Sequence, residues 1–412
     1  MLKCLGEMKR SDENEDLTIW NYNGDKQSIS HKYRGCITNK ENKIVCPSLG
    51  YNHEYTILNK DECYDRIQDV QNWNWYYAME GTMVRLYFYK DKWYLSTHKK
   101  ICAFQSHWSC SQSFGEIFID CLYSIYGTEH TNIYDWFTQQ LNQEQIYYFF
   151  LRSNYQNRII CHTSAVKSNE RLVYIGRRSR EDLKFHLIDK TDESILQNIV
   201  TPTKVPEHFE TIDNLFNFVE NYIDAFMFQG IVGYCKVNDN IDTVKIINTR
   251  YKDLVKVRGN NHNLRFRYLE IRNEPQKVEK LYMLYPKLVQ IFEDYEKIIN
   301  LIIKKISKTY IDRYIQNKYI TLPKEEFMIL RKCNEWCKLK NEKFITNKLI
   351  RDLIDNESPV TIYKMINRFK MEESNHQKLS SFSFKKNNMK NSFDFIESFY
   401  NTDSSSQETI VE

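Results

Sequence analysis

The spacing of apolar residues changes its period at Pro275, and this change constrains the fold more than any other feature of the chain. Before Pro275, short apolar runs alternate with polar, turn-like stretches, a pattern typical of β-strands. After it, apolar residues recur every three or four positions over residues 288–310, which predicts one long helix. Shorter helices are expected over residues 324–340, 347–355 and 360–369.

Three regions follow from this pattern, and the predicted fold class is α+β. Residues 1–274 are expected to form a domain of antiparallel sheets with flanking helices, and residues 275–371 an α-helical C-terminal domain. A length of 412 residues suits such a division. Residues 372–412 are polar, rich in Ser, Asn and Lys, and lack a strong period, which predicts a disordered tail.

Within the first region, two hairpins can be placed from their turns. Residues 36–38 and 43–46 flank the polar turn 39–42, and residues 82–89 and 93–97 flank a second turn. Further strands are expected over residues 145–150, 158–162, 172–177 and 230–237. Helices are expected over residues 114–126, 133–142 and 211–228.

Composition excludes several classes of protein. No apolar run is long enough to span a bilayer, and residues 1–15 are too polar for a signal peptide, so a cytoplasmic protein without membrane association is expected. Eleven cysteines without pairwise rhythm argue against a disulfide framework. Cys333 and Cys337 share a helical face, but a zinc site needs four ligands, so no metal site is predicted.

Charge is unevenly distributed along the chain. The net charge is only +4, yet residues 277–370 hold 20 Lys and Arg against 12 Asp and Glu, a local excess of +8. A solvated helix surface would carry such a charge, and so would a surface that contacts a phosphate backbone. Both interpretations stay open from the sequence.

Several short segments that contain glycine or basic residues occur in a particular order along the chain. Each alone could be a turn, a solvated strand end or a surface arginine. Together they form a fixed series, in which glycines and basic residues recur at strand ends. The series consists of Arg34-Gly35, Glu80-Gly81-Thr82, Ser96 to Lys100, Asn157-Arg158, Gln229-Gly230, and Val244 to Tyr251.

In this order, the segments resemble the covalent nucleotidyltransferase superfamily, specifically the RNA ligases of T-even phages. They resemble still more closely the degenerate ligase-like proteins of large eukaryotic DNA viruses. The resemblance covers residues 30–270 and implies an RNA ligase-like nucleotidyltransferase domain. In that superfamily a lysine attacks the α-phosphate of ATP, carboxylates hold the ribose and a metal ion, and AMP passes to an RNA 5′-phosphate.

The nucleophile motif of the superfamily is a lysine followed at two and three residues by Asp and Gly. Gly81 matches the glycine, Thr82 the following Ser or Thr, and Glu80 stands in place of the aspartate. The lysine position is occupied by Ala78, which has no nucleophile. The resemblance therefore implies that no lysine-adenylate can form at this position.

Three later motifs depart from the family as well. The glutamate of the third motif falls at Phe150 or Leu151, and neither is acidic. The fourth motif normally begins with Glu-Gly, but here the first residue is Gln229. The fifth normally has two lysines, of which Lys245 matches the first and Ile247 replaces the second.

We therefore predict a catalytically degenerate ligase-like protein that binds RNA or a nucleotide without reacting with it. ATP and Mg are the cofactors that the resemblance makes possible. The expected nucleotide contacts are Glu80, Gly81, Thr82, Gln229, Gly230 and Lys245. The expected phosphate or RNA contacts are Arg34, Lys99, Lys100 and Arg158.

Two alternatives stay open. The first is an active ATP-dependent RNA ligase with a relocated nucleophile, for which Lys32, Lys99 and Lys100 are weak candidates. The second is a scaffolding protein that contacts protein partners through its C-terminal helices. If the chain is viral, the host cytoplasm or a viral factory is the expected location.

Overall fold

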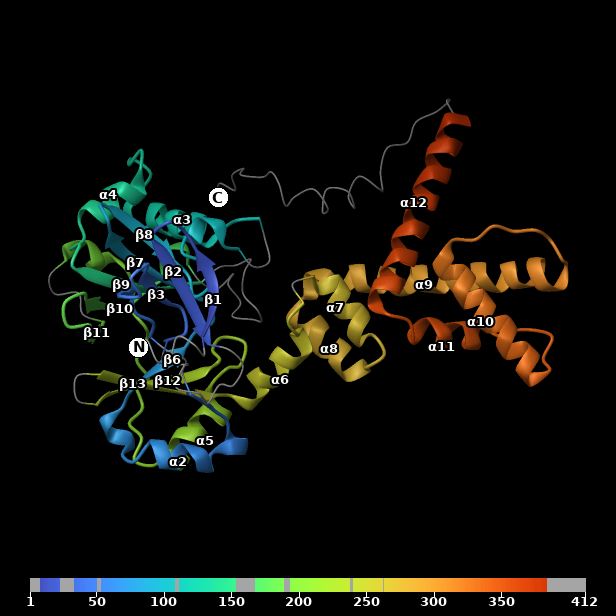
Figure 1. Ribbon diagram of the computed structural model, residues 1–412. Helices are drawn as coiled ribbons and strands as arrows, with labels where there is room; N and C mark the ends of the chain where they lie inside the picture. The colour runs from blue at the N-terminus through green and yellow to red at the C-terminus, as the bar shows by residue number, and fades with distance from the viewer. Residues whose placement is uncertain are drawn as a thin grey trace, which may run out of the picture. The chain divides into compact units, whose positions relative to one another are not determined.

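The chain forms two compact units, an N-terminal unit (Met1–Lys256) and a C-terminal unit (Val257–Glu412) (Figure 1). They are seen in a computed structural model. It describes residues 8–22, 33–49, 53–107, 111–152, 167–188, 193–237, 240–261 and 263–383.

Two antiparallel sheets pack face to face in the upper part of the N-terminal unit in Figure 1. The first has the order β1-β2-β3-β4, with β1 (Met8–Glu13), β2 (Leu17–Tyr22), β3 (Cys36–Asn39) and β4 (Ile44–Cys46). The second has the order β11-β10-β9-β7-β8, with β7 (Thr82–Tyr89), β8 (Lys92–Ser96), β9 (Gln145–Leu151), β10 (Leu172–Ser179) and β11 (Phe185–Leu187).

Helices α3 (Phe114–Tyr126) and α4 (Ile133–Gln139) cover the other face of the five-stranded sheet. The start of α3 is fixed by a capping box: the hydroxyl of Ser113 accepts from the backbone N–H of Glu116 at 3.2 Å, and the Glu116 carboxylate accepts from the Ser113 N–H at 2.6 Å. Phe118 packs edge-to-face against Phe137 of α4 and Phe149 of β9, so the helices and the sheet share one core.

A third sheet lies below the other two in Figure 1, with the order β5-β13-β12-β6. Its strands are β5 (His53–Tyr55), β6 (Asn74–Ala78), β12 (Gly230–Val237) and β13 (Asn240–Ile247), and only β5 and β13 pair in parallel. Helices α2 (Asp61–Arg66) and α5 (Ile212–Tyr222) cover its lower face, where Leu215 and Phe216 of α5 join Val244 and Ile246 of β13 in the core. The upper face of this third sheet points toward the five-stranded sheet.

Residues 200–205 connect the five-stranded sheet to the third sheet through backbone hydrogen bonds. The N–H of Tyr174 in β10 donates to the carbonyl of Val200 at 2.8 Å. The N–H of Tyr77 in β6 donates to the carbonyl of Thr203 at 3.0 Å. This strap therefore ties β10 of the five-stranded sheet to β6, the edge strand of the third sheet.

The C-terminal unit is helical over its described residues. Helix α6 (Thr249–Arg258) crosses the division between the units. It is followed by α7 (Leu264–Ile271), α8 (Pro275–Leu284), α9 (Val289–Tyr310), α10 (Lys324–Lys340), α11 (Asn347–Asp355) and α12 (Pro359–Ser383). A short π-helical turn, Ile311–Ile315, continues α9. None of the described helices is apolar over a length that would cross a membrane.

The predicted α+β class, with a helical C-terminal part, is confirmed. The predicted helix 211–228 is shorter in the structure, where α5 stops at Tyr222. The carboxylate of Asp224 accepts from the N–H of Phe226 at 2.9 Å and starts a turn in place of the helix. The predicted strand 158–162 lies outside the described residues. Helix α12 continues past residue 372, where the tail was expected to start, and the predicted domain limits stay predictions.

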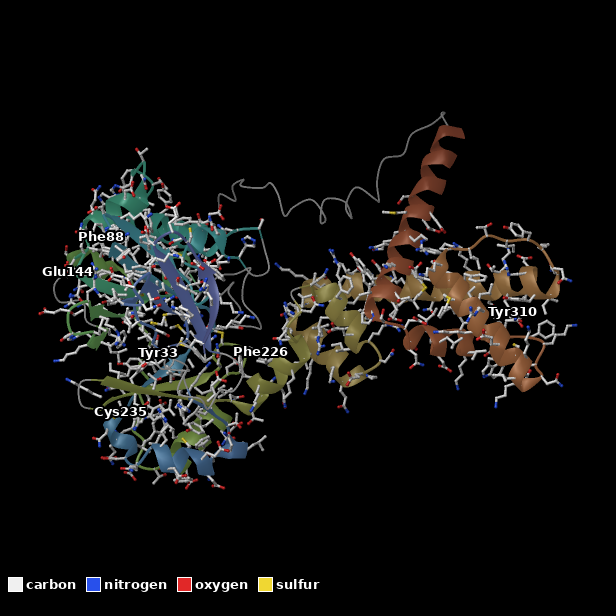
Figure 2. The ribbon with its side chains drawn as sticks, in the orientation of Figure 1. Tyr33, Phe88, Glu144, Phe226, Cys235 and Tyr310 are labelled. Atoms are coloured by element: carbon white, nitrogen blue, oxygen red, sulfur yellow. The ribbon has the colours of Figure 1, made fainter. Side chains whose placement is uncertain are left out.

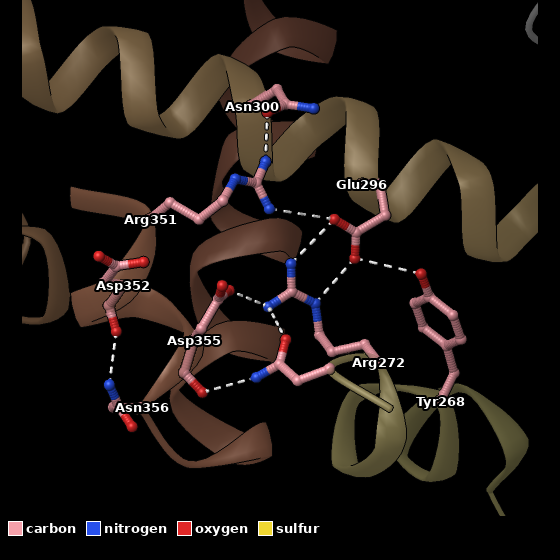
Figure 3. A network of polar contacts seen from close by, with 9 residues as sticks. Tyr268, Arg272, Glu296, Asn300, Arg351, Asp352, Asp355 and Asn356 are labelled. Atoms are coloured by element: carbon pink, nitrogen blue, oxygen red, sulfur yellow. Dashed lines mark hydrogen bonds and ion pairs between the residues drawn. The ribbon is translucent and has the colours of Figure 1, made fainter. Parts of the chain in front are cut away.

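A network of charged side chains joins three helices of the C-terminal unit (Figure 3). Arg272, whose side chain is only 3% exposed, donates to both oxygens of Glu296 on α9 at 2.7 and 2.8 Å and pairs with Asp355 at the end of α11. Tyr268 donates to Glu296 at 3.1 Å. Burial alone would raise the pKa of Glu296, but the charge and hydrogen bonds of Arg272 outweigh it and lower that pKa.

We predict that Arg272→Ala destabilises the C-terminal unit by about 3 kcal/mol, because it removes the cation paired with Asp355 and leaves Glu296 with Arg351 at 3.5 Å in place of two short hydrogen bonds. The measurement is urea unfolding of the full chain. Arg331→Ala is the control, since Arg331 forms an exposed pair with Glu335 at 3.0 Å and should change stability by less than about 0.5 kcal/mol. Equal effects of the two substitutions would contradict the structural importance of the network.

Candidate functional site

The chain crosses between the third sheet and the five-stranded sheet in three residues. Ala78 is the last residue of β6, and Thr82 is the first of β7. Between them, Glu80 is buried, and Gly81 has no room for a side chain: a Cβ there would lie 2.3 Å from the carbonyl oxygen of Leu151. The series predicted to hold a nucleotide therefore begins at the junction of two sheets.

Ala78, Gln229 and Lys245 come together at this junction. Ala78 pairs with Gly230, and the N–H of Gln229 donates to the Ala78 carbonyl at 2.8 Å. The side-chain amide of Gln229 donates to the carbonyl of Met79 at 3.0 Å, and its oxygen accepts from the ammonium of Lys245. The predicted motif residues are thus joined by direct hydrogen bonds.

Glu54 belongs to the same cluster, although the sequence analysis missed it. It lies opposite Lys245 in the parallel pair of β5 and β13, and its carboxylate is 3.6 Å from the Lys245 ammonium. The side chain of Lys245 is 15% exposed. Strand β5 has only three residues and no apolar alternation, so no sequence signal marked Glu54.

The methyl group of Ala78 lies on the upper face of the third sheet. Val232 is the cross-strand partner of both Tyr76 and Lys245, so the side chains of these residues and Ala78 project from the same face. Tyr76, Ala78 and Val232 form a buried cluster. Leu187, Ile188 and Tyr234 pack against this cluster and leave Ala78 4% exposed. A longer side chain at position 78 would have to displace some of these apolar neighbours.

The expected third-motif carboxylate is absent from the strand facing this junction. Phe150 pairs with Met83 of β7, and Leu151 pairs with Thr82. Leu151 is buried in the core under α3. Both alignments of the third motif therefore place an apolar residue beside the crossing, and neither supplies a metal ligand.

A second group of predicted residues gathers around the buried side chain of Arg85. Its guanidinium, 1% exposed, donates to the carbonyl of Thr97 at 2.6 Å and to that of Gly35. Gly35 has a φ of +77°, and a Cβ there would lie 3.1 Å from His98. Arg85 therefore holds the turn containing Arg34 against the turn that ends β8.

The two lysines of that turn differ in their surroundings. Lys100 pairs with Asp12 of β1 at 3.1 Å. Lys99 is exposed and forms no ion pair with the residues that the structure describes. Tyr33, the neighbour of Arg34, appears in Figure 2 at the level where the upper and lower sheets meet. Lys99 is thus the lysine that this turn presents to solvent.

Two hollows lie beside the junction, and the first lies between the five-stranded sheet and the third sheet. The first, about 460 Å³, is lined by Tyr76, Tyr234, Lys184, His186 and Lys236 with their neighbours, and it continues the face that carries Ala78. The second, about 550 Å³, is lined by Met79, the strap and several polar side chains, including Arg152, Glu170, Gln197 and Asn198. Both hollows are partly open to solvent.

Two of the predicted residues, Lys32 and Arg158, lie outside the described ranges. Among the residues within those ranges, no three His, Cys, Asp or Glu side chains gather closely enough to hold a metal ion. Arg85 and His98 were not among the predicted site residues. Arg85 donates hydrogen bonds to both turns, and His98 lies against Gly35. A buried arginine in a strand is visible only once the fold is known.

The chain matches no family model. It is 28% identical over 297 residues to the immediate-early protein ICP-46 homolog of invertebrate iridescent virus 3, a match covering 70% of this chain and 61% of that protein. It is 24% identical over 341 residues to the ICP-46 homolog of invertebrate iridescent virus 6, covering 78% and 71%. The chain thus spans less than two thirds of the first relative's length. The expected likeness to viral proteins is confirmed.

Two solved ligase structures show a distant likeness. A candidate ATP-dependent DNA ligase from Aquifex aeolicus gives a TM-score of 0.40 at 15% identity, covering 72% of this chain and 79% of that one. A mutant RNA ligase of Naegleria gruberi with ATP and Mn gives 0.35 at 10% identity, covering 50% and 59%. Likenesses at such TM-scores do not establish a shared fold.

A pH effect is expected from His98. Burial, together with the charges of Arg85 and Arg34, holds the pKa of His98 well below its ordinary value. Near pH 6.5 the imidazole of His98 takes up a proton in the unfolded chain but stays neutral in the folded chain. The free energy of unfolding therefore decreases as the pH falls below that value. Between pH 7.5 and 5.5 we expect the wild type to lose about 1 kcal/mol more than His98→Asn.

Urea unfolding at the two pH values measures this difference. His208→Asn is the matched control, because His208 is exposed. It should retain the pH dependence of the wild type. An unchanged pH dependence in His98→Asn would contradict a half-buried, neutral imidazole.

Proposed function

We propose that this chain is a ligase-like protein that binds a nucleotide or an RNA end and forms no covalent intermediate with it. The observation that carries the proposal is the Ala78 methyl group beside Gln229 and Lys245, at the junction where the order of the motifs places a lysine nucleophile. Fold resemblance alone would not support this, because function depends on the site.

The nearest amine at the junction is not arranged to replace the missing nucleophile. A lysine nucleophile must be neutral and free to approach the α-phosphate in line. The amine of Lys245 instead donates to Gln229 and lies 3.6 Å from Glu54. Ala78 is also only 4% exposed, in a cluster against which Leu187 and Ile188 pack, so attack from that position would require rearrangement.

The donor set around the junction does not fit a catalytic metal ion. Mg²⁺ prefers several oxygen ligands in octahedral geometry. Phe150 and Leu151 stand where a carboxylate is expected, and the carboxylate of Glu54 faces Lys245. No catalytic step through a metal is therefore part of the proposal.

What persists supports recognition of a phosphorylated ligand. The hollow of about 460 Å³ is lined by the half-buried ring of Tyr234, which could contact a base, and by Lys184 and Lys236, which could contact phosphates. Arg34 and Lys99 add positive charge on the two turns that Arg85 holds together. The names of the relatives place those proteins among the immediate-early products of iridescent viruses. For this chain we propose a matching role in the infected cell, in the host cytoplasm or a viral factory.

We predict that the wild-type chain gains no covalent label when incubated with α-labelled ATP and Mg²⁺ and analysed by denaturing electrophoresis. The reason is the absence of an amine at position 78. A ligase with an intact lysine is the positive control. Stable labelling of the folded chain would contradict the proposal and would favour a relocated nucleophile.

We further predict that Lys245→Gln weakens binding of ATP or a 5′-phosphorylated RNA by about tenfold, as expected for the loss of one charge-assisted hydrogen bond. Calorimetric titration at two salt concentrations measures it. Lys256→Gln is the control, since Lys256 is exposed and pairs with Asp253 at 3.2 Å. Binding that is absent, or insensitive to salt, would contradict the phosphate argument.

A further inference from the structure

The end of α10 and the turn after it carry an unusual group of side chains in the C-terminal unit. Helix α10 ends at Lys340, Asn341 adopts a left-handed conformation with φ of 55°, and α11 begins at Asn347. In Figure 1 this turn forms one corner of the C-terminal unit. We call Lys338, Leu339, Lys340, Lys343, Phe344 and Lys348 the basic corner.

Two large apolar side chains are exposed in the basic corner. Leu339 is 85% exposed and Phe344 is 58% exposed. The ammonium of Lys343 lies 5.7 Å from the centre of the Phe344 ring, so the aromatic ring and the cation are adjacent. This surface can therefore bind a flat ring through Phe344 and anions through the neighbouring lysines.

The positive charge of the basic corner is largely uncompensated. Glu342 is the one acidic residue within positions 338–348. The four lysines form no ion pair with residues in the described part of the chain, whereas Lys305 and Lys332 elsewhere in the unit pair with Glu372 and Glu357. A solvated helix surface usually intersperses both signs of charge.

Helix stabilisation accounts for only part of this charge. Lys338 and Lys340 lie in the last turn of α10, where cations interact favourably with the helix dipole. Lys348 lies in the first turn of α11, which has no acidic residue, and a cation there opposes the dipole. Interaction with the helix dipoles therefore explains neither the position of Lys348 nor the exposure of Phe344.

We propose that the basic corner binds a single-stranded polynucleotide, with phosphates on the four lysines and an unpaired base stacked on Phe344. Single strands combine a charged backbone with accessible base faces, which suits a cationic surface carrying an aromatic ring. A duplex hides its base faces, so it fits this surface less well. The proposal does not depend on the nucleotide site of the N-terminal unit.

Fluorescence anisotropy with a labelled 20-nucleotide oligouridylate that lacks a 5′-phosphate tests the proposal on the full chain. Four phosphate contacts to a single strand predict binding that weakens about 50-fold between 50 and 200 mM salt. Lys338→Gln, Lys340→Gln, Lys343→Gln and Lys348→Gln together should weaken binding at 50 mM salt and flatten this dependence. The control removes equal charge from the exposed residues Lys280, Lys287, Lys304 and Lys308. Equal effects of the two quadruple variants would overturn the proposal.

A second comparison tests the stacked base. Phe344→Ala should weaken binding about tenfold, while Tyr319→Ala, at a 93% exposed position, should leave it unchanged. Oligothymidylate of equal length separates RNA from DNA as the source of the strand, since only the RNA carries the 2′-hydroxyl. Binding of a duplex as tightly as the single strand, or no effect of Phe344→Ala, would overturn the proposal. Lys245→Gln should leave this binding unchanged, which distinguishes it from the nucleotide site.

Discussion

The backbone pairing of Ala78 with Gly230 fixes the geometry on which the N-terminal unit depends. It places the end of β6 beside Gln229, and from there the chain has only three residues in which to enter the five-stranded sheet. Gly81 makes this short crossing possible, because any side chain there would collide with the carbonyl of Leu151. Position 78 is therefore defined by covalent and steric constraints, and the residue found there decides which chemistry the junction can support.

The polar groups that remain at the junction satisfy one another. The ammonium of Lys245 has the amide oxygen of Gln229 and the carboxylate of Glu54 as partners, so a mostly buried charge is stabilised and held in place by the protein. Above Ala78, apolar side chains fill the space next to the methyl group. An amine at position 78 and a carboxylate at position 229 would alter both arrangements together. Ala78, Gln229 and Lys245 are thus physically consistent with one another as a set.

The sequence predicted the elements with a strong period and the hairpins with clear turn residues. The long helix α9 and the hairpin of β7 and β8 follow from apolar spacing and turn residues, and both were predicted. Gln229 and Lys245 were both predicted as nucleotide contacts, but their hydrogen bond depends on the pairing of β12 with β13, and β13 was not among the predicted strands. Glu54 and Arg85 could not be predicted, because their roles depend on a parallel pair with β13 and on carbonyl groups of two distant turns. Long-range pairing of short strands leaves no periodic signal.

The strap of residues 200–205 has a consequence for how a ligand would reach the space between the sheets. Its hydrogen bonds to Tyr174 and Tyr77 join the five-stranded sheet to β6, so the two sheets cannot swing apart like the leaves of a hinge without breaking backbone hydrogen bonds. A ligand entering either hollow would therefore meet a backbone that is already held in place, and little ordering of the backbone would accompany association. The fixed shape of the hollow, rather than closure of the sheets, would then select among ligands.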